Sequence, residues 1–378
     1  MRVLIILPSA LVGGAERVAF SFAEHLLALN HEVTVYTLTR GPGPLWPGLA
    51  DRPGFCLLAP KILSEKTALL RLPIDILRLR RSGRFDLVYT SHVHCNALAS
   101  LCVRLGLLRA RRLVARESTR IFERFHGLRR FVYRQFYRAY GRLDLLILQS
   151  ADMRDSLLAN IRLAPRTRPV VLLNPINLEI IDRERMKPIA DCQVGWSEGS
   201  FNIVYCGRLI TVKRLSLLLQ GLAAVPELAW TLTILGDGPL RKALEEERDR
   251  LGLSDRVIFL GNVMNPYQHF ARADLGVLVS EIEGFPNVLL EMMASGTRAL
   301  VSTPCASGIH DLPGVDILDP ATADGIAARI AEIVAERPDR RAVYRRYVED
   351  HRSIESFTEK LGELVGLELW SIPKDSSR

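Results

Sequence analysis

Residues 1–37, MRVLIILPSALVGGAERVAFSFAEHLLALNHEVTVYT, contain the pattern that sets the fold class. Residues 2–7 (RVLIIL) are an apolar run without polar alternation, which is typical of a strand buried in a parallel sheet. A loop ending in Gly13-Gly14 follows, and residues 32–37 (EVTVYT) indicate a second strand. Between them, apolar residues recur at helical spacing: Val18, Phe22, Leu26 and Leu29. The chain therefore begins with a strand–helix–strand unit whose first turn is rich in glycine.

The same alternation continues along the whole chain. In the first half, the pattern predicts strands at 85–90, 112–115, 143–149 and 170–173 and helices at 95–105 and 127–140. In the second half, it predicts strands at 201–206, 232–235, 257–260, 275–279 and 298–302 and helices at 214–223, 239–251, 322–336 and 352–368. Residues 182–199 lack periodicity, so we expect a linker there. The pattern predicts two doubly wound, Rossmann-like α/β domains with a cleft between them.

Length and composition agree with two globular domains. The chain has 378 residues, of which 48% are hydrophobic and 24% are charged, and this composition excludes disordered and low-complexity classes. The six cysteines include no CxxC pair and no zinc-like spacing with histidine, so we expect free thiols in a reducing compartment. No apolar run reaches the roughly 18 residues that a membrane span needs. A strand, glycine loop and helix explain the apolar start better than a secretory signal does.

Charge is distributed unevenly between the two halves. Residues 1–187 contain 30 Lys/Arg and 15 Asp/Glu, whereas residues 188–378 contain 20 and 27. Residues 104–142 alone contain 12 arginines against Glu117 and Glu123. This stretch is compatible with a solvated helix face, an anionic membrane surface, an anionic substrate or nucleic acid. The aromatic residues interleaved with these arginines also suit a packed amphipathic helix, so we do not expect nucleic-acid binding.

Several loops that follow predicted strands have the composition of anion-binding sites. Gly13-Gly14 precedes a helix, where missing side chains and the positive end of the helix dipole favour a phosphate, although a plain tight turn has the same sequence. The pattern there is GGAER, so the GxGxxG fingerprint of nicotinamide dehydrogenases is absent. Arg208 and Lys213 follow the strand at 201–206 and could clamp a diphosphate, or be two solvated cations.

The segment 280–291, SEIEGFPNVLLE, carries the strongest signal for a site. A strand ends near Val279, Glu283 lies in the loop, and Pro286 can begin a helix that contains Glu291. The N-terminus of that helix would direct its amide groups at a diphosphate between the two carboxylates. The alternative is an ordinary helix with one glutamate before it and one inside it.

Taken in order, five motifs resemble the retaining GT-B glycosyltransferases of family 4. They are GGAER, GRL with Lys213 five residues after Arg208, GDGPLRKALE, FLGNV and EGFPNVLLE. Glu283 and Glu291 have the spacing of the family's glutamate pair, with seven residues between them. The resemblance is densest over 201–314 and reappears at Gly13-Gly14, while 40–170 agrees only in general layout.

The resemblance implies a role for each of these residues. Glu283 would contact the hydroxyls of the donor sugar, Glu291 the ribose, and Arg208 and Lys213 the diphosphate leaving group. Backbone from Gly261 to Val263 would receive the base, and Gly14 would approach the phosphates. The residues between the glutamates complete the expected donor site: Gly284, Phe285, Pro286, Asn287 and Val288. Relatives of this kind need no metal, so we expect neither a metal nor another cofactor.

One departure concerns the first half. Many relatives carry a histidine after the strand matched here by 113–115, whereas this chain has Arg116-Glu117-Ser118. Glu117, His92 and His94 are therefore candidates for contact with the sugar, although the two histidines could equally be loop residues without a catalytic role.

The resemblance implies an enzyme with an acceptor domain at 1–178 and a donor domain at 179–354, and a C-terminal helix at about 355–370 that packs back on the first. We expect retaining transfer of a hexose or N-acetylhexosamine, from a UDP sugar rather than GDP-mannose, to a lipid-linked saccharide in polysaccharide assembly. The basic first half suggests a cytoplasmic enzyme bound peripherally to the anionic inner leaflet. The alternatives are a GT-B epimerase, a phosphorylase and a non-catalytic protein that binds sugar nucleotides.

Overall fold

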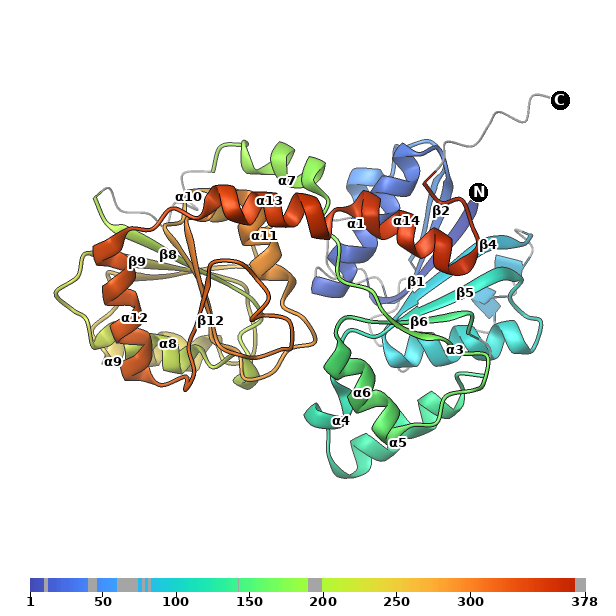
Figure 1. Ribbon diagram of the computed structural model, residues 1–378, viewed down its shortest axis with the longest axis horizontal. Coiled ribbons are helices and arrows are strands. Elements are labelled where there is room, and N and C mark those ends of the chain that lie inside the picture. The colour runs from blue at the N-terminus through green and yellow to red at the C-terminus, as the bar shows by residue number, and fades with distance from the viewer. Residues whose placement is uncertain are drawn as a thin grey trace. The chain divides into compact units, whose positions relative to one another are not determined.

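Two parallel sheets organise the chain in the computed structural model (Figure 1). The structure describes residues 1–9, 13–39, 46–59, 74–76, 79–80, 83–141, 143–189 and 199–370. The chain divides into a first unit, Met1–Asn177 with the C-terminal segment from Ser353, and a second unit, Leu178–Arg352. None of the described helices is both long enough and apolar enough to cross a membrane. The acceptor and donor roles of the two units, and the cleft between them, stay predictions.

The first unit contains a seven-stranded parallel sheet in the order β3-β2-β1-β4-β5-β6-β7. The inner strand β1 is buried along its length except for its first residue, as its apolar sequence predicts. The strands are β1 (Arg2–Ser9), β2 (Glu32–Thr39), β3 (Phe55–Leu58), β4 (Phe85–Ser91), β5 (Ala110–Arg116), β6 (Leu145–Leu148) and β7 (Pro169–Val171).

Helices cover both faces of this sheet, and one of them comes from the C-terminal segment. That helix, α14 (Ile354–Val365), lies beside α1 (Figure 1), where Phe357 meets Phe22 edge to face with ring centroids 5.9 Å apart. Ser353 caps α14 by accepting a hydrogen bond from the Ser356 amide at 3.2 Å. The helices of this unit are α1 (Gly14–Ala28), α3 (Val93–Arg104), α4 (Ile121–Arg124), α5 (Gly127–Arg138), α6 (Ala151–Asn160), α14 and a short 3-10 helix (Trp46–Leu49).

The second unit repeats the architecture with a six-stranded parallel sheet in the order β10-β9-β8-β11-β12-β13. Its strands are β8 (Phe201–Cys206), β9 (Trp230–Leu235), β10 (Val257–Gly261), β11 (Leu275–Leu278), β12 (Ala299–Ser302) and β13 (Val315–Ile317). Its helices are α7 (Leu178–Arg185), α8 (Leu215–Ala223), α9 (Arg241–Arg250), α10 (Tyr267–Arg272), α11 (Asn287–Ser295), α12 (Ala323–Glu336), α13 (Arg341–Arg352) and a 3-10 turn (Thr211–Lys213).

The predicted fold class, two doubly wound α/β halves, is confirmed, and the differences are local. The linker predicted from residue 182 was wrong at its start, because α7 continues to Arg185, and residues 190–198 lie outside the described part. The predicted helix at 352–368 is α14, and a separate helix, α13, ends just before it. Helix α13 was not predicted, because charged residues dominate its sequence and its buried face consists only of Tyr344, Val348 and Arg352.

A buried polar network ties β5 of the first unit to helices α3 and α5. The Glu117 side chain, which follows β5 and is 2% exposed, accepts hydrogen bonds from Tyr140 Oη at 2.6 Å and Asn96 Nδ2 at 3.1 Å. Burial raises the pKa of the Glu117 carboxyl to about 7, while hydrogen bonds from Tyr140, Asn96 and Tyr137 and the charge of Arg116 limit that rise. The Glu117 carboxyl therefore keeps its proton up to about pH 7 in the folded chain, whereas in the unfolded chain it loses the proton near its ordinary pKa of 4.5.

This carboxyl predicts a specific dependence of stability on pH. A folded pKa above the ordinary value of 4.5 means that the free energy of unfolding falls as pH rises from about 4.5 to 7. Glu117→Gln should remove up to about 3 kcal/mol of that dependence. Urea denaturation of parent and variant at a series of pH values measures it.

Glu123→Gln, which leaves the network intact, is the matched control and should keep the parent's dependence. If parent and Glu117→Gln show the same slope between pH 4.5 and 7, Glu117 is ionised in the folded chain and the argument is wrong.

Candidate active site

Parallel strands bring all their carboxyl ends to one edge of a sheet, and in a doubly wound sheet ligands bind where the strand order reverses. In the second unit that point lies between β8 and β11, which pair directly. In the first unit it lies between β1 and β4. The predicted site residues follow these four strands or neighbouring ones.

In the second unit, the structure brings two of the predicted catalytic residues together across the reversal point. Lys213, in the turn after β8, forms an ion pair with Glu283, in the loop after β11. Both side chains are largely buried. The Lys213 ammonium group is suited to bind an anionic leaving group, and the Glu283 carboxylate beside it is suited to accept hydrogen bonds from hydroxyl groups.

Backbone hydrogen bonds fix the two loops that carry this pair. The amide of Glu283 donates to the carbonyl of Cys305 at 2.7 Å, and the amide of Glu281 donates to Val212 at 2.8 Å. The Glu281–Val212 bond joins the loop after β11 to the turn that ends at Lys213. The ion pair therefore rests on connected backbone rather than on two independent surface loops.

Arg208, the third predicted catalytic residue, lies in the same loop as Lys213 and is exposed. Within the described part of the chain, its side chain has no hydrogen bond or ion pair. Its neighbour Leu209 is held by a hydrogen bond from its amide to the carbonyl of Asp237 at 3.0 Å. Gly236 permits this close approach, because a Cβ there would lie 2.1 Å from the carbonyl oxygen of Gly207. The loop is fixed while the Arg208 guanidinium stays available to a ligand.

The predicted base-binding backbone lies at the same edge, at the end of β10. Gly261 has a φ of +71°, and its carbonyl accepts a hydrogen bond from the Gly236 amide at 2.7 Å. Val263 follows in the half-buried loop before α10. These positions agree with the layout expected for the donor site, and their contact with a base stays a prediction.

The segment between the two glutamates adopts the predicted loop and helix. Pro286 caps α11, which begins at Asn287 and ends before Gly296. Gly284, Phe285 and Pro286 are buried, whereas Asn287 and Val288 are half-buried at the first turn. Glu291 lies inside α11 and is largely buried. Glu283 thus precedes the helix and Glu291 follows one turn inside it, as the sequence predicts.

Two weak acids near Glu283, the Cys305 thiol and the Tyr205 phenol, stay neutral at physiological pH. Burial, followed by the nearby Glu283 carboxylate, raises the pKa of the Cys305 thiol to about 12. Burial also raises the pKa of Tyr205 well above its ordinary value, with smaller contributions from Cys206 and Glu283. Neither group supplies a nucleophile at neutral pH.

In the first unit, the reversal point carries a second acid–base pair. Gly13 caps α1 and Gly14 is its exposed first residue. Glu16 lies in the first turn of α1, and its Oε1 is 3.9 Å from His92 Nε2. His92 caps α3 directly after β4, with a φ of +76° that is unusual for a residue with a side chain. The structure therefore places His92 and Gly14 on the two sides of the reversal point.

His92 is neutral in this environment. Burial, together with the nearby His94 and Arg116, lowers its pKa to about 4. The two histidine rings lie with centroids 6.2 Å apart. A neutral imidazole can donate one hydrogen bond and accept another at physiological pH, which suits contact with a sugar hydroxyl.

Two residues of this cluster, Arg116 and Glu16, were not predicted as site residues. Arg116 ends β5, is buried, and donates from Nη2 to Asn174 Oδ1 at 2.6 Å. Burial lowers the pKa of its guanidinium, and Tyr89, Glu16 and Glu117 oppose that shift. The sequence places Glu16 three residues after Gly13, but only the structure shows that its side chain is buried.

Glu117, the third candidate of the first unit, points into the network described above rather than to the surface. One carboxylate oxygen is occupied by Tyr140 and Asn96. Its contact with a sugar stays a prediction, and its observed contacts support α3 and α5.

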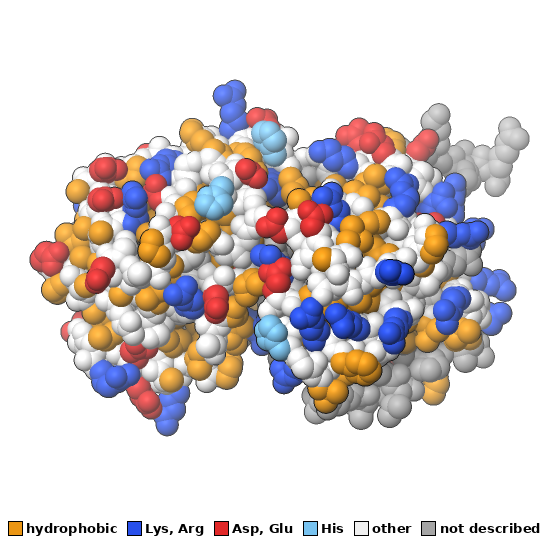
Figure 2. All heavy atoms as spheres, turned by 60° about the horizontal axis from the view of Figure 1, so that its bottom comes forward, with side chains coloured by type: hydrophobic (Ala, Val, Ile, Leu, Met, Phe, Trp, Pro, Cys, Tyr) orange, Lys and Arg blue, Asp and Glu red, His pale blue; other side chains and the backbone are white. Residues whose placement is uncertain are grey.

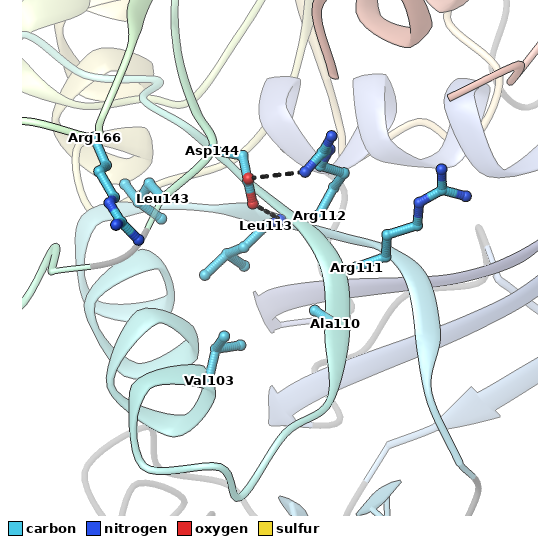
Figure 3. A pocket seen from close by; sticks show the side chains of 8 residues that line it. All are labelled: Val103, Ala110, Arg111, Arg112, Leu113, Leu143, Asp144 and Arg166. Atoms are coloured by element: carbon cyan, nitrogen blue, oxygen red, sulfur yellow. Dashed lines mark hydrogen bonds and ion pairs between the residues drawn. The ribbon is translucent and has the colours of Figure 1, made fainter. Parts of the chain in front are cut away.

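A small cavity of about 260 Å³ lies elsewhere in the first unit (Figure 3). Asp144 there accepts a hydrogen bond from the Leu113 amide at 2.8 Å and lies 3.5 Å from Arg112, with Arg166 on its other side. The cavity lies at the amino ends of β5 and β6, the edge opposite the predicted site residues. Its lining residues are Val103, Ala110, Arg111, Arg112, Leu113, Leu143, Asp144 and Arg166.

Across the described ranges, no three His, Cys, Asp or Glu side chains gather in a way that could hold a metal ion. The expectation that the reaction needs no metal stays a prediction.

Curated relatives match parts of the chain. A Campylobacter jejuni protein, N-acetylgalactosamine-N,N'-diacetylbacillosaminyl-diphospho-undecaprenol 4-alpha-N-acetylgalactosaminyltransferase, is 32% identical over 177 residues, which are 47% of this chain and 46% of that protein. The lipopolysaccharide 1,6-galactosyltransferase of Salmonella typhimurium is 29% identical over 176 residues, covering 44% and 46%. The chain thus matches about half the length of these relatives.

Solved structures match over nearly the full chain. The Anabaena protein Alr3699/HepE, solved in complex with UDP-glucose, gives a TM-score of 0.78 at 19% identity, covering 97% of this chain and 99% of that one. Sucrose-phosphate synthase from Thermosynechococcus elongatus gives 0.74 at 16% identity, covering 96% and 98%. At these identities the likeness establishes the fold, which is GT-B.

Two family models account for most of the sequence. The model of glycosyltransferase family 4 matches residues 12–180, and the model of glycosyl transferases group 1 matches residues 200–336. The first contains the Gly13–His92 side of the fold and the second contains the Lys213–Glu283 pair. The chain belongs to glycosyltransferase family 4.

Proposed function

We propose that this glycosyltransferase moves a hexose or N-acetylhexosamine from a UDP sugar to an acceptor hydroxyl and retains the configuration of the anomeric carbon. The observation that carries the proposal is the Lys213–Glu283 pair across the reversal point of the second sheet. A diphosphate is recognised by fixed cations, and a sugar is recognised by a carboxylate that accepts from its hydroxyls. This unit offers both at one edge.

The reaction breaks the bond between the anomeric carbon and the diphosphate oxygen and forms one to the acceptor oxygen on the same face. The acceptor's proton passes to the departing diphosphate oxygen. Lys213, Arg208 and the amino end of α11 stabilise the negative charge that develops there. A glycosidase-like double displacement would need a second carboxylate about 5 Å from Glu283. Its observed partner is an ammonium group, which favours same-face attack.

Relatives support the choice of donor and acceptor. The Anabaena structure contains UDP-glucose, and the Campylobacter relative is named for transfer to a saccharide on diphospho-undecaprenol. Two Rhizobium relatives are named for lipopolysaccharide core biosynthesis. We therefore propose a UDP sugar in preference to GDP-mannose, and a lipid-linked saccharide as acceptor in cell-surface polysaccharide assembly.

The same proposal includes an anionic membrane surface at the cytoplasmic side as partner. Helix α5 exposes Leu128, Phe131 and Val132 on one face, at 78%, 58% and 43%. Exposed arginines flank that stripe on α5 and just before it: Arg124, Arg129, Arg134 and Arg138. Figure 2 shows Lys and Arg side chains gathered over the first unit with hydrophobic side chains between them. An amphipathic helix of this kind binds in the headgroup region of anionic bilayers.

Slow hydrolysis of the donor by purified protein tests the activity. We expect release of UDP from one member of a panel of UDP and GDP sugars, and EDTA should not change the rate. Glu283→Gln should lower kcat/KM by about 10- to 100-fold, because a hydrogen bond to a charged group is lost. Lys213→Met should lower kcat by about 100-fold or more, because charge on the leaving group is no longer stabilised.

Glu281→Gln is the matched control, because this exposed carboxylate lies in the same loop two residues earlier and should leave the rate unchanged. Turnover that persists in both Glu283→Gln and Lys213→Met would refute the assigned site. Binding of UDP sugar without turnover, even with a lipid-linked acceptor present, would favour a non-catalytic binding protein. Conversion of the sugar without transfer would favour an epimerase.

Pelleting with lipid vesicles tests the membrane surface. We expect the protein to sediment with vesicles that contain phosphatidylglycerol and to be released by high salt, since the attraction depends on arginines. A Leu128→Ser/Phe131→Ser double variant should sediment several-fold less, because the apolar face is removed.

The control is Val343→Ser, which changes a side chain of the second unit that is 50% exposed and should sediment like the parent. Equal sedimentation with neutral and anionic vesicles at low salt would contradict the charge argument, and unchanged sedimentation of the α5 variant would contradict the choice of helix.

A further inference from the structure

Arg352 is a buried cation next to the loop that carries Glu283. It is the last residue of α13 and of the second unit, and only 4% of its surface is exposed. The buried face of α13 consists of Tyr344, Val348 and Arg352, one helical turn apart. This face packs on α11, the helix that begins directly after the Glu283 loop.

The guanidinium of Arg352 contacts two aromatic side chains, Phe285 and Tyr347. Its central carbon lies 4.7 Å from the centroid of the Phe285 ring and 5.6 Å from that of Tyr347. Two of its nitrogens, Nη2 and Nε, donate to Tyr347 Oη at 3.0 and 3.3 Å. Phe285 is the second residue after Glu283 and is itself buried. The contact therefore reaches the donor-site loop through a single rigid side chain.

Stability alone does not explain a cation at this position. The third nitrogen, Nη1, is buried without a hydrogen-bond partner in the part of the chain that the structure describes. An apolar side chain of similar length would fill the space without that unpaired donor, and such replacements are often neutral or stabilising. A planar cation adds orientation, because its face stacks on the ring while its edge is tied to Tyr347.

The Phe285 contact completes the restraints on the Glu283 loop. The Glu283 amide is bonded to Cys305, and its carboxylate is paired with Lys213. These two contacts fix the loop from the β12 side and the β8 side, whereas Arg352 fixes it from α13. Arg352 thus adds a contact to the Phe285 ring from α13, beyond the packing that buries this ring and the backbone bonds of the loop.

We propose that Arg352 is a positioning residue that orders the Glu283 loop for the transfer step through its stack on Phe285. The proposal rests on the proposed function for its catalytic consequence, but the ordering of the loop can be measured without any activity. Arg352 acts through Phe285 and does not touch the donor.

The test compares Arg352→Met, Arg352→Lys and the control Arg345→Met in the full-length chain. Arg345 lies on the same helix, and its two terminal nitrogens bond Asp182 at 2.7 and 2.8 Å, away from the Glu283 loop. Hydrogen exchange of residues 281–290 reports the order of the loop. Donor hydrolysis reports kcat and KM separately.

We expect Arg352→Met to exchange faster over residues 281–290 and to lower kcat by about 10- to 100-fold with little change in donor KM, because a small displacement of a reacting group is costly. Arg352→Lys should be intermediate, since an ammonium keeps the attraction to the ring and loses the planar stack. Arg345→Met should be less stable than the parent, but its hydrogen exchange over residues 281–290 and its kcat should equal those of the parent.

Unchanged exchange in Arg352→Met would overturn the proposal. Faster exchange with an unchanged kcat would overturn its catalytic part. If Arg345→Met produces the same effects, the role of Arg352 is general support of α13, and the proposal is wrong. A parent protein that turns over no donor, even with a lipid-linked acceptor present, would refute the proposed function, while the exchange comparison would still decide whether Arg352 orders the loop.

Discussion

Strand direction is the constraint on which both candidate sites depend. Every pairing in the two sheets is parallel, so each crossover returns the chain to the same edge and each carboxyl end opens into a loop there. At the two reversal points, neighbouring loops diverge to opposite faces and leave room for side chains. Lys213 meets Glu283 at one of these points, and His92 approaches Glu16 at the other. A single antiparallel strand at either place would send one partner to the wrong edge.

The two pairs differ in charge, and this difference suits different tasks. Lys213 and Glu283 neutralise each other, and an arriving diphosphate would compete with Glu283 for the ammonium group and release the carboxylate toward the sugar. His92 is neutral because burial and neighbouring groups lower its pKa. A neutral imidazole contributes no charge and binds a ligand through directional hydrogen bonds. Under the proposed function, the charged pair of the second unit suits a diphosphate, and the neutral imidazole of the first unit suits sugar hydroxyls.

The fold and the positions of Lys213 and Glu283 in it could be predicted from the sequence because their signals are local. Apolar strand runs, glycine turns and the spacing of Glu283 and Glu291 lie within short windows, and α11 begins where Pro286 predicts. The strands β3 and β13 were not predicted; both lie at an edge of their sheet, and none of their residues is fully buried. Arg116 was not predicted as a site residue, because the sequence gives no sign that it is buried and bonded to Asn174, 58 residues later.

The order in which the chain's parts meet has a consequence for synthesis. The second unit is one continuous segment, whereas the first is completed by α14, which enters after residue 352. Leu361, Val365 and Leu369 of that segment belong to the same buried core as Val3 and Ile5 of β1. During translation, the sheet of the first unit emerges before the second unit, but part of one apolar face stays uncovered until α14 leaves the ribosome. The second unit can close its own core earlier, so the first unit is made before the second but completed after it.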